Sequence, residues 1–347
     1  MTPKRTMTEE KPRAILCIGP NPAFQTTLYF EHFKVGQVNR ARNKTTSIGG
    51  KGQNFVLATE QYGFQDKVTL LQILGGSTGQ ALETSLRERG FHLVNVYSEK
   101  TTRSCTTVLD DESGNMTEMI EPSERLNDDE VQHFEEVGKC LLRNGSDELL
   151  GIALCGTYPP GVTGESFANI LSAKPKESIF LLDAYKDVTK ILDTGKVDVM
   201  KINREELNTL IESHHGSSLD SNDVPSNARK FFELYQVGNL AITDGPEKAY
   251  LFSNNHREYH TFEIPTLSSI LSNDLTKPLQ INPLGAGDTC SAVFLCEYTK
   301  SKDVVASFQH GLAAASASCL VLHQTAQFDI EVMKLMLKSI KVQKSSF

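Results

Sequence analysis

The sequence predicts an α/β fold with a mostly parallel central sheet, helices on both faces of that sheet and a small β-sheet lid. The short, continuously apolar run at residues 14–19 is typical of a strand that is buried on both faces, and residues 68–74 are also expected to be a strand. Helical segments alternate with these runs through short loops, and this β-α-β order favours a parallel sheet. A hairpin pattern at residues 101–121 interrupts the alternation and indicates a few strands that leave the main sheet.

The composition limits the class of protein. The 347 residues can bury a large core, either as one α/β unit or as two lobes. The net charge is −8 and no basic stripe stands out, so we expect no nucleic-acid partner. The seven cysteines include no CxxC pair, which favours reduced thiols over a disulfide frame or a zinc site. The sequence shows no secretory signal and no apolar run of roughly 20 residues, so we expect a cytoplasmic protein that does not bind membranes.

In the N-terminal half we expect a disordered tail at residues 1–13, followed by a single domain over residues 14–347. Residues 28–43 carry aromatic side chains among charges, which is typical of exposed strands with one apolar face. With the hairpin they predict lid strands inserted at about 24–46 and 101–121. The other elements expected here are strands 14–19, 68–74 and 93–96, and helices 55–62 and 75–90.

In the C-terminal half the alternation resumes. Asn127, followed three residues later by Glu130, predicts a capping box for a helix that ends near residue 143. Residues 214–227 and 266–277 are polar and are expected to be loops. The expected strands are 149–155, 179–183, 197–202, 240–243, 251–253 and 259–264. The expected helices are 165–173, 204–212, 228–235, 288–298, 303–322 and 329–340, of which the last three finish the chain.

The stretch Gly285, Ala286, Gly287 and Asp288 precedes a run of small and apolar residues. Glycines let several N–H groups point at one place, and a helix start adds unpaired N–H groups, so the stretch predicts an anion site. An aspartate repels a bound phosphate, but it is useful there if it takes a proton from a hydroxyl that attacks the phosphate. The alternative is a glycine-rich turn with Asp288 as the helix cap.

A second glycine cluster contains Gly49, Gly50 and Lys51. It is not a phosphate-loop NTPase motif, because Lys51 is followed by Gly52 rather than by Ser or Thr. The glycines allow a ligand to approach the backbone, Lys51 supplies positive charge, and Asn54 can bond a hydroxyl. The alternative is a tight strand-to-helix turn with a solvated lysine.

Lys201, Asn203 and Glu206 lie where an expected strand runs into a helix. Open α/β sheets bind ligands at the carboxyl ends of their strands. A carboxylate and an amide oxygen at such a place can hold the water shell of Mg²⁺, which keeps several waters. The alternative is an N-capped helix, with Asn203 as the cap and Glu206 as the third helical residue.

Arg103 stands just before the first strand of the expected hairpin, and its planar guanidinium can donate two parallel hydrogen bonds to a phosphate. The alternative is a solvated arginine at a strand edge. The histidines, among them His214 and His215, show no metal-ligand spacing, so we expect them to be exposed or satisfied by hydrogen bonds.

The joint order of these motifs resembles the ribokinase-like (PfkB) family of sugar and nucleoside kinases, and is most similar to its subgroup of 1-phosphofructokinase and tagatose-6-phosphate kinase. The resemblance covers about residues 14–337. The motifs shared with the family are Asn-Pro-Ala at 21–23, Gly-Gly-Lys-Gly-x-Asn at 49–54, Thr-Arg at 102–103, Lys-x-Asn-x-x-Glu at 201–206 and Gly-Ala-Gly-Asp at 285–288. The stretches similar to the subgroup are 21–23, 36–40, 102–105 and 156–161.

The resemblance implies a three-layer ribokinase-like fold and a role for each motif. Asp288 is the implied catalytic base, and the implied anion hole consists of Gly285, Ala286 and Gly287. The implied ATP-binding residues are Lys201, Asn203, Glu206, Thr243 and Gly245, and Asn203 and Glu206 would organise Mg²⁺ through water. The implied substrate-binding residues are Gln25, Gly49, Gly50, Lys51, Asn54 and Arg103.

The implied activity is the ATP- and Mg²⁺-dependent phosphorylation of a ketohexose phosphate, with fructose 1-phosphate converted to fructose 1,6-bisphosphate. The alternatives are a kinase of another sugar or a nucleoside, and a catalytically weak sensor of a sugar phosphate. The sequence departs from the family pattern in three places. Gln25 stands where relatives commonly have Asp, and Lys248 stands where the family usually has Gly. Residues 266–277 form a longer connection to the Gly-Ala-Gly-Asp motif than the family usually has. An exposed apolar face of the lid also favours a homodimer.

Overall fold

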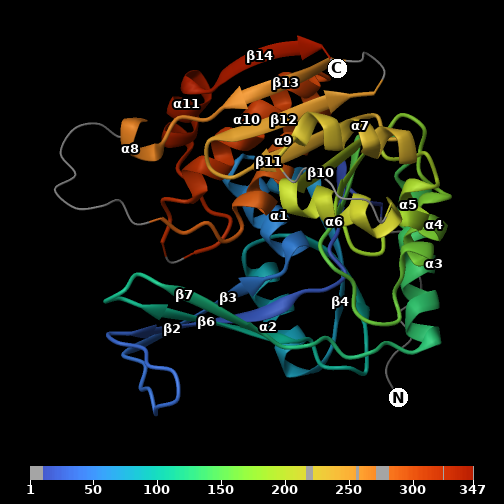
Figure 1. The fold of residues 1–347 in the computed structure, drawn as a ribbon. Coiled ribbons are helices and arrows are strands. Elements are labelled where there is room, and N and C mark those ends of the chain that lie inside the picture. The colour runs from blue at the N-terminus through green and yellow to red at the C-terminus, as the bar shows by residue number, and fades with distance from the viewer. Residues whose placement is uncertain (1–10, 216–221, 255–257, 271–280, 323, 347) are drawn as a thin grey trace.

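The computed structural model describes residues 11–215, 222–254, 258–270, 281–322 and 324–346 (Figure 1). Its main sheet contains the strands β1 (Ile15–Ile18), β4 (Val68–Leu74), β5 (His92–Tyr97), β8 (Gly151–Cys155), β9 (Ile179–Asp183), β10 (Val199–Asn203), β11 (Asn239–Asp244), β12 (Lys248–Ser253), β13 (Glu258–Glu263) and β14 (Lys341–Ser346). Their order is β14-β13-β12-β11-β10-β9-β8-β1-β4-β5. All pairs from β11 to β5 are parallel, and β12, β13 and β14 are antiparallel to their neighbours. The predicted mostly parallel sheet is confirmed.

Both faces of this sheet are buried. In β1, Ile15 and Cys17 belong to one hydrophobic core and Leu16 and Ile18 to the other, because successive side chains of a strand point to opposite faces. The first core includes the helices α1 (Lys51–Gln61), α2 (Gly76–Glu88), α9 (Ala286–Ser301), α10 (Val304–Ser318) and α11 (Ile330–Ser339). The second includes α3 (Asp128–Asn144), α4 (Gly164–Leu171), α5 (Thr189–Leu192), α6 (Arg204–His215) and α7 (Val224–Leu234). None of the helices in the described ranges is long and apolar enough to cross a membrane.

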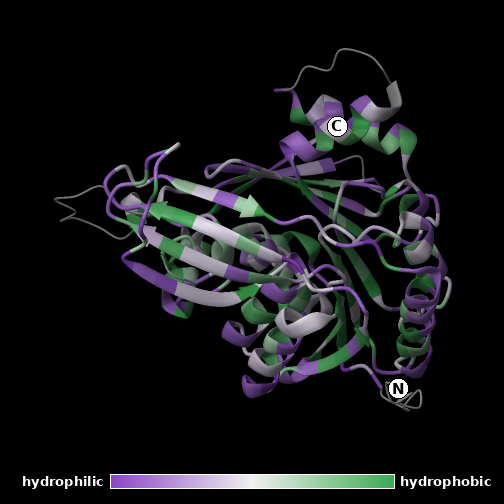
Figure 2. Ribbon diagram, turned by 90° about the horizontal axis from the view of Figure 1, so that it is seen from below, coloured by the Kyte–Doolittle hydropathy of each residue, from purple (hydrophilic) through white to green (hydrophobic). Residues whose placement is uncertain are grey.

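A separate four-stranded sheet forms the predicted lid. Its strands are β2 (Ala23–Phe30), β3 (Asn43–Gly49), β6 (Ser104–Asp110) and β7 (Met116–Ile120), in the order β3-β2-β6-β7. Figure 2 shows this sheet projecting from the body of the molecule, with hydrophilic and hydrophobic residues mixed along its strands. The expectation of strand over residues 28–43 is wrong in part, because residues 31–42 form a connecting loop in which Gly36 has φ of 80°.

Helix α1 begins at Lys51, four residues before the expected start at residue 55. Gly50 is its N-cap, with φ of 106°, a value that favours glycine. A Cβ atom on Gly52 would lie only 2.3 Å from the Cα atom of Gly19, so this glycine lets the helix touch the end of β1. Lys51 and Asn54 therefore belong to the first turn of a helix, not to a loop before it.

Several expectations for the C-terminal half need correction. The loop expected at residues 214–227 is shorter, because α6 reaches His215 and Asp223 caps α7 early by accepting the N–H of Ser226 at 3.0 Å. The chain does not finish with three helices, because β14 follows α11 and pairs with β13. The polar sequence of β14 gives no apolar pattern to predict it from. The expected connector contains α8 (Leu267–Ile270), while residues 271–277 of it, residues 216–221 and residues 1–10 of the expected tail lie outside the described residues.

Candidate active site

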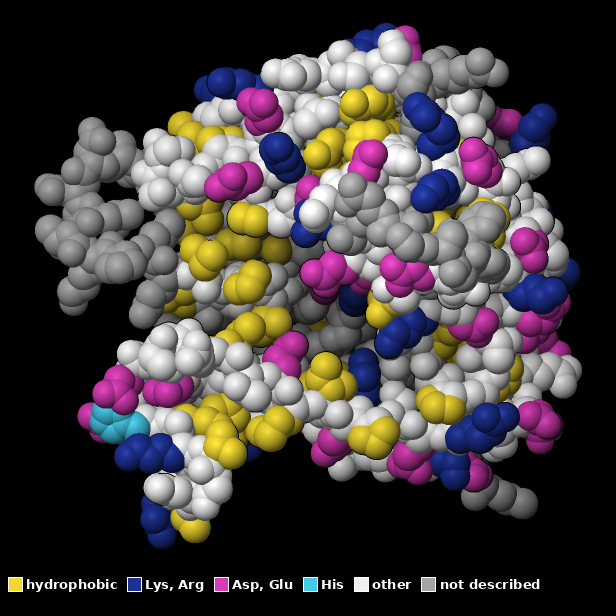
Figure 3. All heavy atoms as spheres, in the orientation of Figure 1, with side chains coloured by type: hydrophobic (Ala, Val, Ile, Leu, Met, Phe, Trp, Pro, Cys, Tyr) yellow, Lys and Arg dark blue, Asp and Glu magenta, His cyan; other side chains and the backbone are white. Residues whose placement is uncertain are grey.

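The carboxyl ends of several parallel strands meet the N-terminal ends of α1 and α9, and Figure 3 shows the surface hollowed between the lid and the body of the molecule. Asp183 ends β9, and Lys201 lies near the end of β10. A Cβ atom on Gly156, which follows β8, would lie 3.1 Å from the Cβ atom of Lys51. The motif residues are thus gathered at the edge of the sheet where open α/β proteins bind their ligands.

Helix α9 starts at Ala286, the second residue of the Gly-Ala-Gly-Asp stretch. Gly285 is its N-cap, with φ of 75°. The N–H group of Ala286 donates to the carbonyl oxygen of Pro283 at 3.2 Å, whereas those of Gly287 and Asp288 have no backbone acceptor among the described residues. First-turn N–H groups carry the positive end of the helix dipole. Gly287 and Asp288, more than Ala286, therefore offer donors to an anion.

Asp288 is buried in the first turn of α9 and is not its N-cap, so the simple cap interpretation does not describe it. Its Oδ2 atom accepts a hydrogen bond from Nδ2 of Asn54 at 2.7 Å, and Oδ1 has no hydrogen bond within the described ranges. Burial raises the pKa of Asp288 above its usual range, although Lys51 and the bond from Asn54 work in the opposite direction. The residue thus combines a raised pKa with one free oxygen.

Asp183 holds two lysines together beneath the start of α9. Its Oδ1 atom lies 3.0 Å from Nζ of Lys51, and its Oδ2 atom lies 3.2 Å from Nζ of Lys201. The hydroxyl of Ser291 donates to the same Oδ2 at 2.6 Å. Lys201 also donates to the carbonyl oxygen of Gly287 at 2.9 Å. This network fixes both ammonium groups at the entrance to the helix.

The charges of this network stabilise one another. The carboxylate of Asp183 raises the pKa of Lys51. Burial is the largest influence on the pKa of Lys201 and lowers it, but the Asp183 carboxylate and the other acidic groups nearby together outweigh burial, so the pKa of Lys201 is raised. Burial raises the pKa of Asp183, but the two lysines and the hydrogen bond from Ser291 together more than reverse this effect, so its pKa lies below the usual range. All three groups are therefore charged near neutral pH, so this network of two lysines and one carboxylate carries one net positive charge.

Asn203 and Glu206 form the reciprocal hydrogen bonds of a capping box at the start of α6. The N–H of Asn203 donates to Oε2 of Glu206 at 2.9 Å, and the N–H of Glu206 donates to Oδ1 of Asn203 at 2.8 Å. Asn203 is paired in register with Thr243 of β11, and Gly245 follows in the turn after that strand. Glu206 lies close enough to Lys51 to contribute to its raised pKa. The capping contacts fix the Glu206 carboxylate and leave its Oε1 without a hydrogen bond among the described residues.

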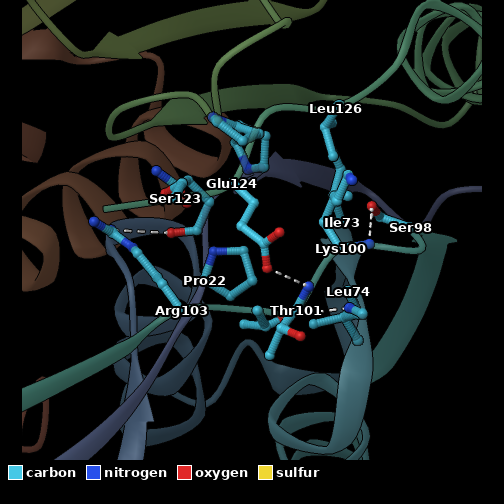
Figure 4. Close-up of a pocket in the computed structure, with 15 residues that line it drawn as sticks. Pro22, Ile73, Leu74, Ser98, Lys100, Thr101, Arg103, Ser123, Glu124 and Leu126 are labelled. Carbon is cyan, nitrogen blue, oxygen red and sulfur yellow. Dashed lines mark hydrogen bonds between the residues drawn. The ribbon is translucent and has the colours of Figure 1, made fainter. Parts of the chain in front are cut away.

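Arg103 lies between the lid and the loop that follows β1, beside a small cavity of about 30 Å³ (Figure 4). Its Nη2 atom donates to the carbonyl oxygen of Asn21 at 3.4 Å, and its buried Nε has no partner in the described part of the chain. The side chain of Asn21 in turn contacts Thr157 at 3.2 Å and Ser123 at 2.8 Å. Arg103 is thus held by one long hydrogen bond and keeps several donors for a ligand.

Gln25 lies at the base of the lid sheet. Gly49 and Gly50, the two glycines that precede Lys51, lie beside it. The Nε2 atom of Gln25 donates to Oγ1 of Thr107 in the neighbouring strand at 2.7 Å. A Cβ atom on Gly49 would lie 3.3 Å from the Cβ atom of Gln25, and one on Gly50 would lie 2.9 Å from the Cα atom of Pro22. These glycines therefore let the base of the lid sheet close on the loop after β1.

The motifs alone do not identify Asp183, Ser291 or Thr325. Asp183 could have been predicted as a site residue, because it is an acidic residue that directly ends an apolar strand. The same reasoning predicts Lys201, from its place near the carboxyl end of a strand. Ser291 lies among the apolar residues of α9, and Thr325 lies in an irregular segment, so neither carries a local signal. Only the folded chain shows that they contact the predicted site.

A buried carboxylate at a helix start, free N–H donors beside it and lysines held at strand ends suit phosphoryl transfer. Together with the three-layer architecture and the β-sheet lid, they define a kinase of the ribokinase-like fold.

The chain belongs to the pfkB family of carbohydrate kinases, whose profile, described as "pfkB family carbohydrate kinase", matches residues 21–331. The tagatose-6-phosphate kinase of Staphylococcus epidermidis is 22% identical over 281 residues, which are 80% of this chain and 83% of that protein. The structure of phosphofructokinase-2 from Escherichia coli matches with a TM-score of 0.78 at 19% identity, over 94% of this chain and 99% of that one. A possible 1-phosphofructokinase from Thermotoga maritima matches with a TM-score of 0.76 at 19% identity, over 96% and 99%. The predicted family and fold are confirmed, and the protein is a phosphotransferase.

Proposed function

We propose that this carbohydrate kinase uses ATP and Mg²⁺ to phosphorylate a hydroxyl of a ketohexose phosphate, and that it converts fructose 1-phosphate to fructose 1,6-bisphosphate. The kinases of this family take the phosphoryl group from ATP. The likeness to a tagatose-6-phosphate kinase and to phosphofructokinases supports a sugar phosphate as acceptor. The observation that carries the proposal is the buried Asp288, whose free oxygen lies in the helix turn that offers N–H donors.

In the proposed reaction, the hydroxyl oxygen of the sugar attacks the γ-phosphorus of ATP. The bond from this phosphorus to the bridging oxygen breaks and ADP leaves, while the hydroxyl proton passes to Oδ1 of Asp288. The N–H groups of Gly287 and Asp288 and the ammonium of Lys51 stabilise the charge of the transferring group. Lys201 uses two of its three N–H donors on Asp183 and Gly287, which leaves one for an ATP phosphate.

Asn203 and Glu206 would hold Mg²⁺ through its water shell. Their fit rests on the fixed carboxylate of Glu206, whose Oε1 is free, and on the preference of Mg²⁺ for oxygen ligands and retained water. When bound, the ion neutralises charge on the ATP phosphates. Thr243 and Gly245, beside Asn203 at the sheet edge, complete the proposed nucleotide side of the site.

Arg103, Gln25 and Lys51 form the proposed sugar side of the site, with Gly49 and Gly50 as its close-packed wall. The free donors of Arg103 suit a phosphate. Gln25 has its amide nitrogen on Thr107, so its carbonyl oxygen is the group left to accept a bond from a sugar hydroxyl. Asn54 retains a second N–H for the sugar while its first is bound to Asp288.

We also propose that residues 14–347 act as one domain and that two chains pair through their lids. Met119 and Ile120 on the edge strand β7 are 50% and 58% exposed, and exposed apolar side chains support an interface. Light scattering with chromatography checks this: we expect a dimer for the wild type and a monomer for a Met119→Lys/Ile120→Lys variant. A wild-type chain that stays monomeric contradicts the pairing.

The function is tested by offering the purified protein ATP and Mg²⁺ with a panel of sugars, sugar phosphates and nucleosides. We expect the fastest turnover on fructose 1-phosphate, and a loss of at least about 10²–10³-fold in Asp288→Ala. The proposal fails if no phosphosugar is turned over or if Asp288→Ala is fully active. Turnover of only an unphosphorylated sugar or a nucleoside identifies the first alternative. Thermal stabilisation by a sugar phosphate without ATP consumption identifies the sensor.

A further inference from the structure

A chain of two hydrogen bonds leads from an irregular segment after α10 to the carboxylate of Asp288. The Oγ1 atom of Thr325 lies 3.2 Å from Oδ1 of Asn54, and Nδ2 of Asn54 lies 2.7 Å from Oδ2 of Asp288. Thr325 is 271 residues away from Asn54 in sequence, and it belongs to none of the motifs. Asn54 is 8% exposed, so both ends of its amide depend on protein partners.

The segment that carries Thr325 is fixed against the start of α9. Asn282 donates its backbone N–H to the carbonyl oxygen of Cys319 at 2.7 Å, and its side-chain amide lies 3.3 Å from the carbonyl oxygen of Val321. Ala326 is buried at φ of 54°, a value that costs energy for any residue except glycine. A Cβ atom on Gly285 would lie 3.1 Å from the backbone nitrogen of Ala326. Such local strain persists only where surrounding contacts hold it, and it is common at functional sites.

The chemistry of the amide makes its orientation matter. An ionised carboxylate only accepts hydrogen bonds, so Asn54 must present its nitrogen, and not its oxygen, to Asp288. The hydroxyl of Thr325 can donate to the oxygen that then faces the other way. We propose that Thr325 is a positioning residue, whose hydroxyl holds the Asn54 amide so that the amide binds Oδ2 of Asp288 and leaves Oδ1 for the substrate proton. The part that concerns the substrate rests on the proposed function.

Removal of this hydroxyl leaves Oδ1 of Asn54 buried without a donor, which is unfavourable. A cavity of about 400 Å³ adjoins Thr325 and is lined also by Ser47 and Gln327. Once the Thr325 hydroxyl is gone, the Asn54 amide is free to turn away from Asp288, and water from this cavity, whose lining includes polar side chains, can supply the missing donor. Asp288 then loses the N–H that stabilises its charged form, and its carboxylate becomes harder to ionise.

The test is a titration of the Asp288 carboxyl carbon by NMR in protein labelled with ¹³C-aspartate, without substrate. The signal is identified by its loss in Asp288→Asn. We expect the titration midpoint of Asp288 to be higher by roughly half to one pH unit in Thr325→Val than in wild type. In Thr325→Ser we expect the midpoint to return to the wild-type value. The groups that also act on Asp288 are Lys51 of α1, Asp183 of β9, Lys201 of β10 and the Cys155 thiol of β8, and all are retained in both variants.

Kinetics supply the second readout. In Thr325→Val we expect the acid limb of kcat to move to higher pH, and KM for the sugar substrate to rise, because the second N–H of Asn54 turns away with the first. An unchanged Asp288 titration in Thr325→Val, with or without loss of thermal stability, overturns the proposal and leaves Thr325 a purely structural role. The NMR titration needs no turnover, so a protein that phosphorylates no sugar refutes the proposed function while the contact between Thr325, Asn54 and Asp288 is still judged by the midpoint.

Discussion

Lys51 and Asp183 lie 132 positions apart in the sequence, yet Nζ of Lys51 is 3.0 Å from Oδ1 of Asp183. The other oxygen of this carboxylate lies 3.2 Å from Nζ of Lys201. One buried carboxylate thus fixes two ammonium groups, one on the proposed sugar side of the site and one on the nucleotide side. Two such cations repel each other when the charge between them is removed.

Asp183→Asn tests this relationship, because the amide has the shape of the carboxylate without its charge. We expect the free energy of unfolding to fall by about 3–5 kcal/mol, as when one partner of a buried ion pair is removed. We also expect kcat/KM to fall, because both lysines lose their fixed positions. Urea unfolding and steady-state kinetics measure the two effects.

Ser291→Ala is the matched control for Asp183→Asn. It removes the hydroxyl that donates to Oδ2 at 2.6 Å and leaves both lysine contacts in place. The loss of this single hydrogen bond should cost about 1 kcal/mol. If Asp183→Asn is as stable as Ser291→Ala, the carboxylate does not hold the lysines in the way described.

Asp183 and Asp288 affect the pH dependence of stability in opposite directions. Burial raises the pKa of Asp288, so its contribution favours folding at low pH and is lost as the pH rises through the raised value. Burial also raises the pKa of Asp183, but its charged and hydrogen-bonded partners lower it by more, so the net pKa is lowered. The contribution of Asp183 to folding stability is therefore present at neutral pH and is lost as the pH falls through the lowered value. Asp288 therefore costs stability at the pH where it can act as a base.

Asp288→Asn should consequently be more stable than the wild type at neutral and mildly alkaline pH. The gain should shrink as the pH falls through the raised pKa of Asp288, because the wild-type carboxyl is then neutral as well. Over the same range the wild-type kcat should decline with falling pH, because the base becomes protonated. Urea unfolding at a series of pH values checks the first effect, and a stability difference that does not vary with pH speaks against it.

The local motifs could be predicted from the sequence because each depends on residues that are close together. The capping boxes of Asn127 with Glu130 and of Asn203 with Glu206 are set by a three-residue spacing, and both form. The apolar runs of the central strands likewise follow from burial on both faces. The place of Asp288 at a helix start follows from the glycines before it.

Other features depend on partners that are distant in sequence. The start of α1 at Lys51 requires the contact between Gly52 and Gly19, which the glycine cluster does not show by itself. Asp183 gains its role only when α1 and β10 bring their lysines to it. β14 has a polar sequence at a sheet edge, so its pairing with β13 leaves no hydrophobic signal.

Gly285→Ala should disturb the start of α9 in two ways. The φ of 75° is unfavourable for alanine by about 1–2 kcal/mol, and the new Cβ atom would lie 3.1 Å from the backbone nitrogen of Ala326. Gly63→Ala is the control, because Gly63 has φ of 74° and no described atom within 4 Å of the place that a Cβ atom would take. We expect similar losses of stability from backbone strain, but a loss of kcat only in Gly285→Ala. Equal kcat in the two variants would show that crowding at Ala326 does not affect the site.

Arg103 offers the sharpest distinction between a sugar phosphate and an unphosphorylated substrate. Within the described part of the chain, Arg103 makes one long hydrogen bond to Asn21 and its Nε has no partner, so the guanidinium donors are available. Hydrogen bonds to a charged group are worth about 1.5–3 kcal/mol, so Arg103→Ala should raise KM for a ketohexose phosphate by about 10–100-fold. Arg103→Lys should recover only part of this loss, because an ammonium cannot replace the planar guanidinium.

Arg87→Ala, which removes a surface arginine paired with Glu83, is the control and should leave KM unchanged. If KM for the phosphorylated sugar is the same in Arg103→Ala and Arg87→Ala, Arg103 does not bind the phosphate, and the alternative of an unphosphorylated sugar or nucleoside as substrate gains support.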